Sequence, residues 1–192
     1  KIFNSMAYGH YYNLYGVDQV RSQADAVLAS SKSSDKALLK TTMSMYKIAK
    51  REGDNSIFIP YLKTGVEMTA NSEEEGVLKK REHLLPEYAL YIENDEKRAI
   101  ELKRNLQPDG WEEDANLLNN FAWWCFEMEI NLDEAEQFAR KGIELAEAGR
   151  QKGNILDTLA EICNLKGDCG EAVDYIRLAV AEDPEYDYFQ KQ

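Results

Sequence analysis

The sequence is poor in helix-breaking residues and has no long apolar run. Only 4 prolines and 11 glycines occur in 192 residues, which argues against a loop-rich β fold. No stretch of about 18 consecutive apolar residues is present, so we expect neither a transmembrane helix nor membrane insertion. Because the chain begins with Lys1 rather than methionine, we expect a removed segment or a neighbouring domain to precede it.

Histidine and cysteine are also scarce. The cysteines Cys125, Cys163 and Cys169 form no C-x-x-C pair, and His10 and His83 lie far apart in the chain. A zinc site would therefore need scattered ligands, and we expect no metal and no cofactor. Neither histidine has a neighbouring serine or cysteine motif that would indicate nucleophilic catalysis. The sequence predicts a protein that is not an enzyme.

Positive charge is outnumbered by negative charge in the second half of the chain. The net charge is −12, but residues 1–92 hold 12 Lys/Arg and 11 Asp/Glu, whereas residues 93–192 hold 11 Lys/Arg and 24 Asp/Glu. Nucleic-acid binding needs a cationic surface that displaces counterions, so we expect no nucleic-acid partner. The charge changes near "NLQPDGWEED", the best candidate for a linker, and this divides the chain into residues 1–108 and 109–192.

The chain contains internal repeats. Residues 154–184 read as two amphipathic helices separated by Gly167, and a shift of 37 or 38 residues aligns them with residues 116–148. Weaker matches extend to the N-terminus, with turns near Gly16, Gly53, Asn94, Asn131 and Gly167. The pattern predicts about five antiparallel helix pairs, with the helices at 2–14, 17–30, 35–52, 55–70, 73–93, 95–106, 114–130, 132–147, 151–166 and 169–181.

Local signals modify some of these helices. Pro60 is expected to distort the first turns of helix 55–70, and Pro86 to kink or break helix 73–93. Capping boxes are predicted where a residue whose side chain can cap a helix N-terminus is followed three residues later by Glu. The three pairs are Ser72 with Glu75, Asn131 with Glu134, and Asp168 with Glu171.

The last hairpin resembles the tetratricopeptide repeat family. Its small residues Ala160, Ala172 and Ala179 and the trailing Pro184 fit that family's pattern, and residues 109–192 hold the two clearer repeats. The resemblance implies an all-α, tetratricopeptide-like α-solenoid that winds as a right-handed superhelix, with residues 1–108 forming degenerate hairpins of one continuous array.

A narrower resemblance concerns the stretch "LNNFAWWCFEMEINLDEAEQFARKGIELA" and the later "NILDTLAEI". It is similar to the C-terminal helical-repeat region of some bacterial thioredoxin-like proteins. This resemblance implies a lost catalytic domain and favours a periplasmic or extracytoplasmic location over the cytoplasm. The redox C-x-x-C motif of that family is absent, so no activity carries over to this chain.

Family analogy also implies a concave groove lined by the first helix of each hairpin. The internal alignment places on it, in the second half, Asn119, Trp123, Phe126, Asn154, Asp157, Glu161 and Asn164, and in the first half Lys47, Lys50 and Arg51, together with Lys40 and His10. Aromatic and asparagine side chains in a concavity suit an extended peptide. Alternatively, the groove is filled by the protein itself, and the lysines form an ordinary solvated face.

Three functions follow from this interpretation. The first is a non-catalytic scaffold module that binds a protein or peptide in the groove, with Trp123 and Phe126 as anchors. The second is an accessory domain of an extracytoplasmic thioredoxin-like oxidoreductase. The third is a structural spacer or an oligomerisation unit, which leaves a homo-oligomer open.

The stretch "NNFAWWCFEMEI", residues 119–130, divides between two faces of one predicted helix. Trp124 and Cys125 align with core positions of the next repeat, whereas Trp123 points toward the groove. Cys125 and Cys163 are predicted as small buried thiols, with a disulfide as the alternative, and Cys169 as the exposed thiol. The aromatic tail "PEYDYFQKQ" is predicted to cover the end of the array.

Overall fold

The computed structural model describes residues 2–189 and consists of helices joined by short connections. Helix accounts for 76% of the described residues, and no strand occurs among them, which confirms the all-α prediction. The chain divides into two compact units, Lys1–Leu102 and Lys103–Gln192, called unit 1 and unit 2 here. No helix of the described part is long and apolar enough to cross a membrane.

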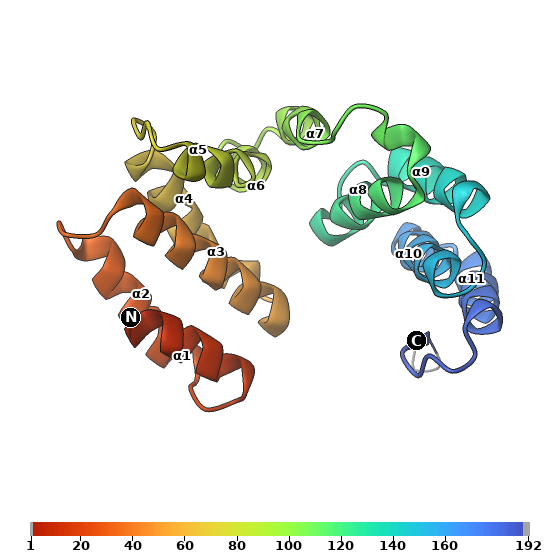
Figure 1. Cartoon of the computed structure of the whole chain (residues 1–192). Helices are drawn as coiled ribbons and strands as arrows, with labels where there is room; N and C mark the ends of the chain where they lie inside the picture. Colours follow the sequence, from red (N-terminus) through yellow and green to blue (C-terminus); the bar gives the residue numbers. More distant parts are fainter. Residues whose placement is uncertain (1, 190–192) are drawn as a thin grey trace. The chain divides into compact units, whose positions relative to one another are not determined.

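Unit 1 is built mainly around its third helix. The helices are α1 (Ile2–Tyr11), α2 (Val17–Ala29), α3 (Asp35–Glu52), η1 (Asn55–Ile57), α4 (Ile59–Met68), α5 (Glu75–Glu82), α6 (Leu85–Tyr91) and the first part of α7 (Glu96–Asn105). Helix α3 contacts α1, α2, α4 and α5 (Figure 1). The core is apolar, with Val20, Leu39, Met45, Phe58 and Leu62 fully buried.

Two prolines set helix boundaries in unit 1. The predicted helix 55–70 is instead the short 3-10 helix η1 followed by α4, which has Pro60 in its first turn. The predicted helix 73–93 is likewise two helices, α5 and α6, and Pro86 lies in the first turn of α6. Proline is tolerated in a first turn because that turn has no carbonyl partner for its amide. The middle of the chain therefore holds three short helices and not the predicted hairpin.

Unit 2 contains two helix pairs. Its elements are the end of α7, η2 (Trp111–Glu113), α8 (Ala115–Met128), α9 (Leu132–Leu145), α10 (Arg150–Lys166) and α11 (Cys169–Glu182). Helix α8 pairs with α9 and α10 with α11, and α10 also contacts α8 and α9 (Figure 1). The close approach of α9 to α10 depends on Gly142, where a Cβ would lie 3.3 Å from Ile155 Cγ2.

The C-terminal tail covers apolar surface of unit 2, as predicted for residues up to Phe189. The Phe189 side chain is buried together with Leu156 and Ala179. Gly153 of α10 makes room for it, since a Cβ there would lie 2.7 Å from the Phe189 ring. The last tail residues, 190–192, lie outside the described range.

The division between the units falls inside α7, a few residues before the sequence boundary of 108/109. Arg104 of α7 belongs to unit 2, where its guanidinium lies 5.5 Å from the centre of the Phe121 ring and 5.7 Å from that of Phe138. It also donates two hydrogen bonds, of 2.8 and 2.7 Å, to the carboxylate of Glu134. The predicted linker contributes Trp111, which is buried against Phe121 at a centroid distance of 5.1 Å.

The five predicted turns all lie between helices. Gly53 and Gly167 end α3 and α10 with positive φ angles of 66° and 91°, and Asn94 and Asn131 adopt φ angles of 55° and 52°. Glycine and asparagine are the residues that reach this left-handed region most readily.

The predicted capping boxes are wrong. Helix α5 begins after Glu74, so Ser72 does not cap it, and Asp168 makes no side-chain bond to the start of α11. Glu171 instead forms an ion pair with Arg140 at 3.1 Å. Asn131 donates a 2.6 Å hydrogen bond to the Glu134 carboxylate, not to a backbone group. Contacts with arginines of other helices therefore recruited Glu171 and Glu134, which the local pattern assigned to capping boxes.

Candidate partner-binding surfaces

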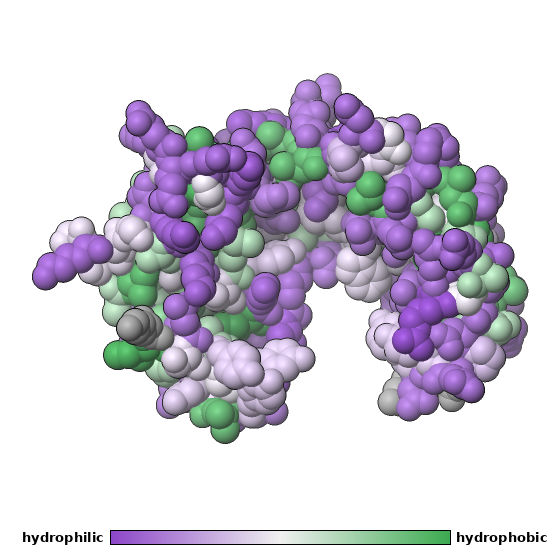
Figure 2. Space-filling view, in the orientation of Figure 1, coloured by the Kyte–Doolittle hydropathy of each residue, from purple (hydrophilic) through white to green (hydrophobic). Residues whose placement is uncertain are grey.

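The first surface lies in unit 2 and is called the α8–α10 face. It consists of the residues that the sequence assigned to the groove in this half: Asn119, Trp123 and Phe126 on α8, and Asn154, Asp157, Glu161 and Asn164 on α10. Within each helix these residues recur at three- or four-residue intervals and so share one side of it. Figure 2 shows a mainly hydrophilic outer surface for this unit, with small separate apolar patches.

Two aromatic rings form the apolar part of the α8–α10 face. Trp123 and Phe126 are both half-buried, and their ring centroids are 5.0 Å apart at an interplanar angle of 47°. The neighbouring Trp124 is only 4% exposed and packs with Phe121 on the other side of α8. The prediction that the two tryptophans serve different faces agrees with this geometry.

Two side-chain oxygens of the α8–α10 face are buried without a hydrogen-bond partner among the described residues. They are Oδ1 of Asn119 and Oδ1 of Asp157. The two residues are 38 positions apart, one repeat period, and α8 and α10 are in contact. A buried acceptor without a donor is costly, so such atoms call for water or a ligand.

Asp157 is an unusual carboxyl group. Its side chain is only 5% exposed, and burial, with a smaller contribution from the charge of Glu161, raises its pKa to about 6. No cationic side chain of the described residues lowers that pKa.

Asn154 and Asn164 are exposed, and Glu161 and Asn164 line a cavity of about 360 Å³ between α10 and α11. The face thus combines apolar rings with polar atoms that lack partners.

The raised pKa of Asp157 predicts a pH-dependent stability. The unfolded carboxyl ionises near its ordinary pKa of 3.8, whereas the folded one holds its proton up to about pH 6. The free energy of unfolding should therefore fall as the pH rises from about 4 to 6. Asp157→Asn should raise the free energy of unfolding at pH 7.5 by about 1–2 kcal/mol, less than the full shift implies because solvent screens the charge. At pH 4 it should have little effect.

Urea denaturation at the two pH values measures this effect. All three tryptophans, Trp111, Trp123 and Trp124, lie in unit 2, so tryptophan fluorescence follows the unit that contains Asp157. Asp133→Asn is the control, because the Lys166 ammonium lowers the pKa of Asp133. Removing the Asp133 carboxylate should therefore lower the free energy of unfolding at pH 7.5. If Asp157→Asn also destabilises at pH 7.5, the carboxylate is stabilised in the folded protein and the interpretation is wrong.

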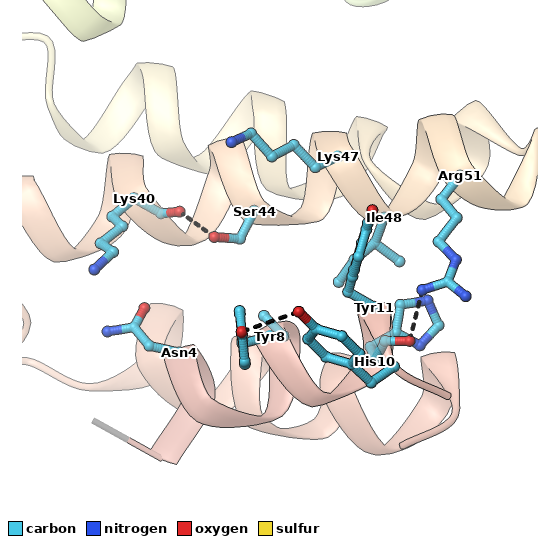
Figure 3. Close-up of a pocket in the computed structure, with 11 residues that line it drawn as sticks. Asn4, Tyr8, His10, Tyr11, Lys40, Ser44, Lys47, Ile48 and Arg51 are labelled. Atoms are coloured by element: carbon cyan, nitrogen blue, oxygen red, sulfur yellow. Dashed lines mark hydrogen bonds between the residues drawn. The ribbon is translucent and has the colours of Figure 1, made fainter. Parts of the chain in front are cut away.

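The second surface lies in unit 1 and is called the α1–α3 cleft (Figure 3). It has a volume of about 570 Å³ and is lined from α1 by Asn4, Ala7, Tyr8, His10 and Tyr11, with Tyr12 just beyond, and from α3 by Lys40, Ser44, Lys47, Ile48 and Arg51. Of the basic residues assigned to the groove, Lys40, Lys47 and Arg51 line this cleft. Lys50 does not line it and lies over the Tyr46 ring at 5.6 Å.

Hydrogen bonds fix one end of the α1–α3 cleft. Arg51 donates a 2.7 Å bond to the backbone carbonyl of His10 and another of 2.7 Å to Asn13 Oδ1. The buried His10 ring bonds to the backbone oxygen of Tyr15 at 2.7 Å and to Glu52 Oε1 at 3.1 Å. The C-terminal end of α1 is thereby tied to the C-terminal end of α3, while the rest of the cleft stays open.

Sequence reasoning missed the tyrosines of this cleft. Tyr8, Tyr11 and Tyr12 are 67%, 69% and 54% exposed, and the hydroxyls of Tyr8 and Tyr12 are 3.1 Å apart. Figure 2 shows pale side chains of intermediate hydropathy over α1. The sequence feature that could have indicated these tyrosines as a site is the density of tyrosine in "YGHYYNLYG", residues 8–16.

The thiols and the acidic groups do not form a recognisable chemical centre. Cys125 and Cys163 are free and buried, and burial raises both pKa values, that of Cys125 to about 12. A thiol that stays protonated at neutral pH is a poor nucleophile. Cys169 is free and exposed, as predicted. Within residues 2–189 no group of three or more histidine, cysteine or acidic side chains could hold a metal ion.

Comparison with known proteins adds no family to these observations. The chain matches no protein-family model, and a search of curated proteins finds no significant match.

Proposed function

We propose that this chain is a non-catalytic interaction module that binds a protein or peptide segment on the α8–α10 face. The observation that carries the proposal is the pair of buried, unpartnered oxygens of Asn119 and Asp157 beside the half-buried Trp123–Phe126 pair. An extended peptide can supply donors for these oxygens and apolar contacts for these rings. It offers backbone N–H donors at regular spacing and apolar side chains between them.

The arrangement of the helices supports a tetratricopeptide-like array in unit 2. The pairs α8–α9 and α10–α11 follow each other at a spacing of 37 or 38 residues, and α10 contacts both helices of the preceding pair. Such stacking presents the first helices of successive pairs side by side. We propose that α8 and α10 play this role and that their shared face is the binding surface.

Trp123 is the residue whose truncation should weaken binding most. Large aromatic side chains at the centre of an interface contribute most to affinity, and Trp123→Ala should weaken binding at least about tenfold. The ligand is obtained by selecting a random peptide display library on the immobilised full chain. The affinity of a selected peptide is then measured by calorimetry with wild type and with the variant.

Leu145→Ala is the matched control, since Leu145 is an exposed apolar residue of the same unit at the end of α9. It should bind the selected peptide as wild type does. Circular dichroism confirms that both variants keep their helices. Wild-type affinity in Trp123→Ala, with several independent peptides, excludes the α8–α10 face as the binding surface.

A further inference from the structure

We infer that the α1–α3 cleft of unit 1 is a separate site that binds an acidic peptide segment of a partner protein. The inference concerns the other unit and a ligand chosen by its negative charge, so it does not depend on the α8–α10 face. It rests on the cleft's size, on its cations and on its exposed aromatic wall.

The cations that line the cleft have no acidic partner within the part of the chain that the structure describes. None of the described residues forms a hydrogen bond or an ion pair with the ammonium groups of Lys40 and Lys47. The guanidinium of Arg51 bonds only to neutral groups, the carbonyl of His10 and the side-chain oxygen of Asn13. No carboxylate is among the described lining residues. Lys40, Lys47 and Arg51 therefore line the cleft without an acidic residue among its described lining residues, which complements an anionic ligand.

The shape of the cleft suits a chain segment. Lys40, Lys47 and Arg51 follow one another along α3 at intervals of seven and four residues, so they lie on one side of the helix over about three turns. Figure 3 shows Lys40 directed toward α1 near Asn4 at one end, and Arg51 at the other. Carboxylates of an extended or helical segment can meet such a row of cations, whereas a single small anion can meet only one part of it.

The aromatic wall supplies the apolar contact. Tyr8 and Tyr11 line the cleft opposite Ile48, and the Arg51 guanidinium lies 5.4 Å from the centre of the Tyr11 ring. Tyrosine combines a large apolar ring with few rotatable bonds, so it loses little entropy when a ligand binds. An acidic segment with at least one aromatic or apolar side chain therefore fits both the charge and the lining.

Two synthetic peptides that differ only in charge test the inference. Acetyl-EEYEE-amide and acetyl-QQYQQ-amide are titrated into the full chain at low salt. The acidic peptide should bind at least about tenfold more tightly, and its affinity should fall as salt is added. Lys40→Gln/Lys47→Gln should weaken acidic-peptide binding by about tenfold, and Tyr11→Ala should also weaken it.

The control is Lys36→Gln/Lys63→Gln, which removes the same charge from exposed lysines of unit 1 outside the cleft. It should bind the acidic peptide nearly as wild type does. Equal affinity for the two peptides, or an equal loss in both double variants, would overturn the inference. So would a dimer of the free protein that the Lys40/Lys47 variant abolishes, because the occupant would then be a second copy of this chain.

Discussion

Phe121→Ala is expected to lower the free energy of unfolding by about 3–5 kcal/mol, the range for truncating a buried aromatic side chain. Phe121 is fully buried on α8. Its ring centroid lies 5.1 Å from that of Trp111, 5.5 Å from Phe138 and 6.0 Å from Trp124. Truncation leaves a cavity that these large, mutually packed rings cannot easily fill, and it removes several favourable ring contacts.

Phe126→Ala is the matched control for this prediction. It is the same substitution on the same helix, but Phe126 is half-buried and its one ring contact among the described residues is with Trp123. Phe126→Ala should lower the free energy of unfolding by much less than Phe121→Ala does. Urea denaturation followed by tryptophan fluorescence measures both, since unit 2 holds all three tryptophans. Similar losses in the two variants would contradict the division of α8 into a core face and a surface face.

Gly65→Ala is expected to destabilise unit 1 by about 2–3 kcal/mol, although alanine normally favours a helix over glycine by about 1 kcal/mol. A Cβ at Gly65 in α4 would overlap the hydroxyl of Thr42 in α3. That hydroxyl is buried and shares its one proton between the backbone oxygens of Tyr61 at 3.1 Å and Leu38 at 3.2 Å. The hydroxyl cannot move away without losing these bonds, so α3 and α4 would have to separate.

Gly76→Ala serves as the control for Gly65→Ala. Gly76 lies in α5 of the same unit and is exposed, with only a carboxylate oxygen of Glu74 near the site of a Cβ. Gly76→Ala should slightly raise the stability of unit 1. Thermal unfolding by circular dichroism and tyrosine fluorescence measures both variants. The double variant Gly65→Ala/Thr42→Ala should lose less than the sum of its single changes. Additive losses would show that the Thr42 contact is not the cause.

The local features of the sequence predicted the secondary structure well. The break at Pro86 and the turns at Gly53 and Gly167 follow from the backbone preferences of single residues. The division between Trp123 and Trp124 follows from helical periodicity, because adjacent residues point about 100° apart around a helix axis. The prediction of a right-handed superhelix is different in kind, since it concerns the packing of many helices, and it remains a prediction.

The candidate sites could be read from the sequence only in part. The residues of the α8–α10 face were assigned from the family resemblance and the internal alignment, and their role as a binding surface remains a prediction. That Asn119 and Asp157 bury an oxygen without a partner could not be predicted, since burial depends on the neighbouring helices. In the α1–α3 cleft, the tyrosines of α1 lie opposite cations some 30–40 positions later in the chain. A local sequence pattern cannot predict such a contact, because it covers only neighbouring positions.

By itself the sequence determined an all-helical protein, the positions of most helix ends and which of the two adjacent tryptophans of α8 turns inward, because these depend on residues within a few positions of one another. Tertiary structure alone decided which polar groups have partners. Glu171 and Glu134 bind arginines in place of helix ends, and Arg104 joins the aromatic cluster around Phe121. Lys40 and Lys47 have no carboxylate partner among residues 2–189. The reason is physical: a charged side chain binds whichever opposite charge the packing of the helices brings nearest, and that choice is not encoded in its neighbours along the chain.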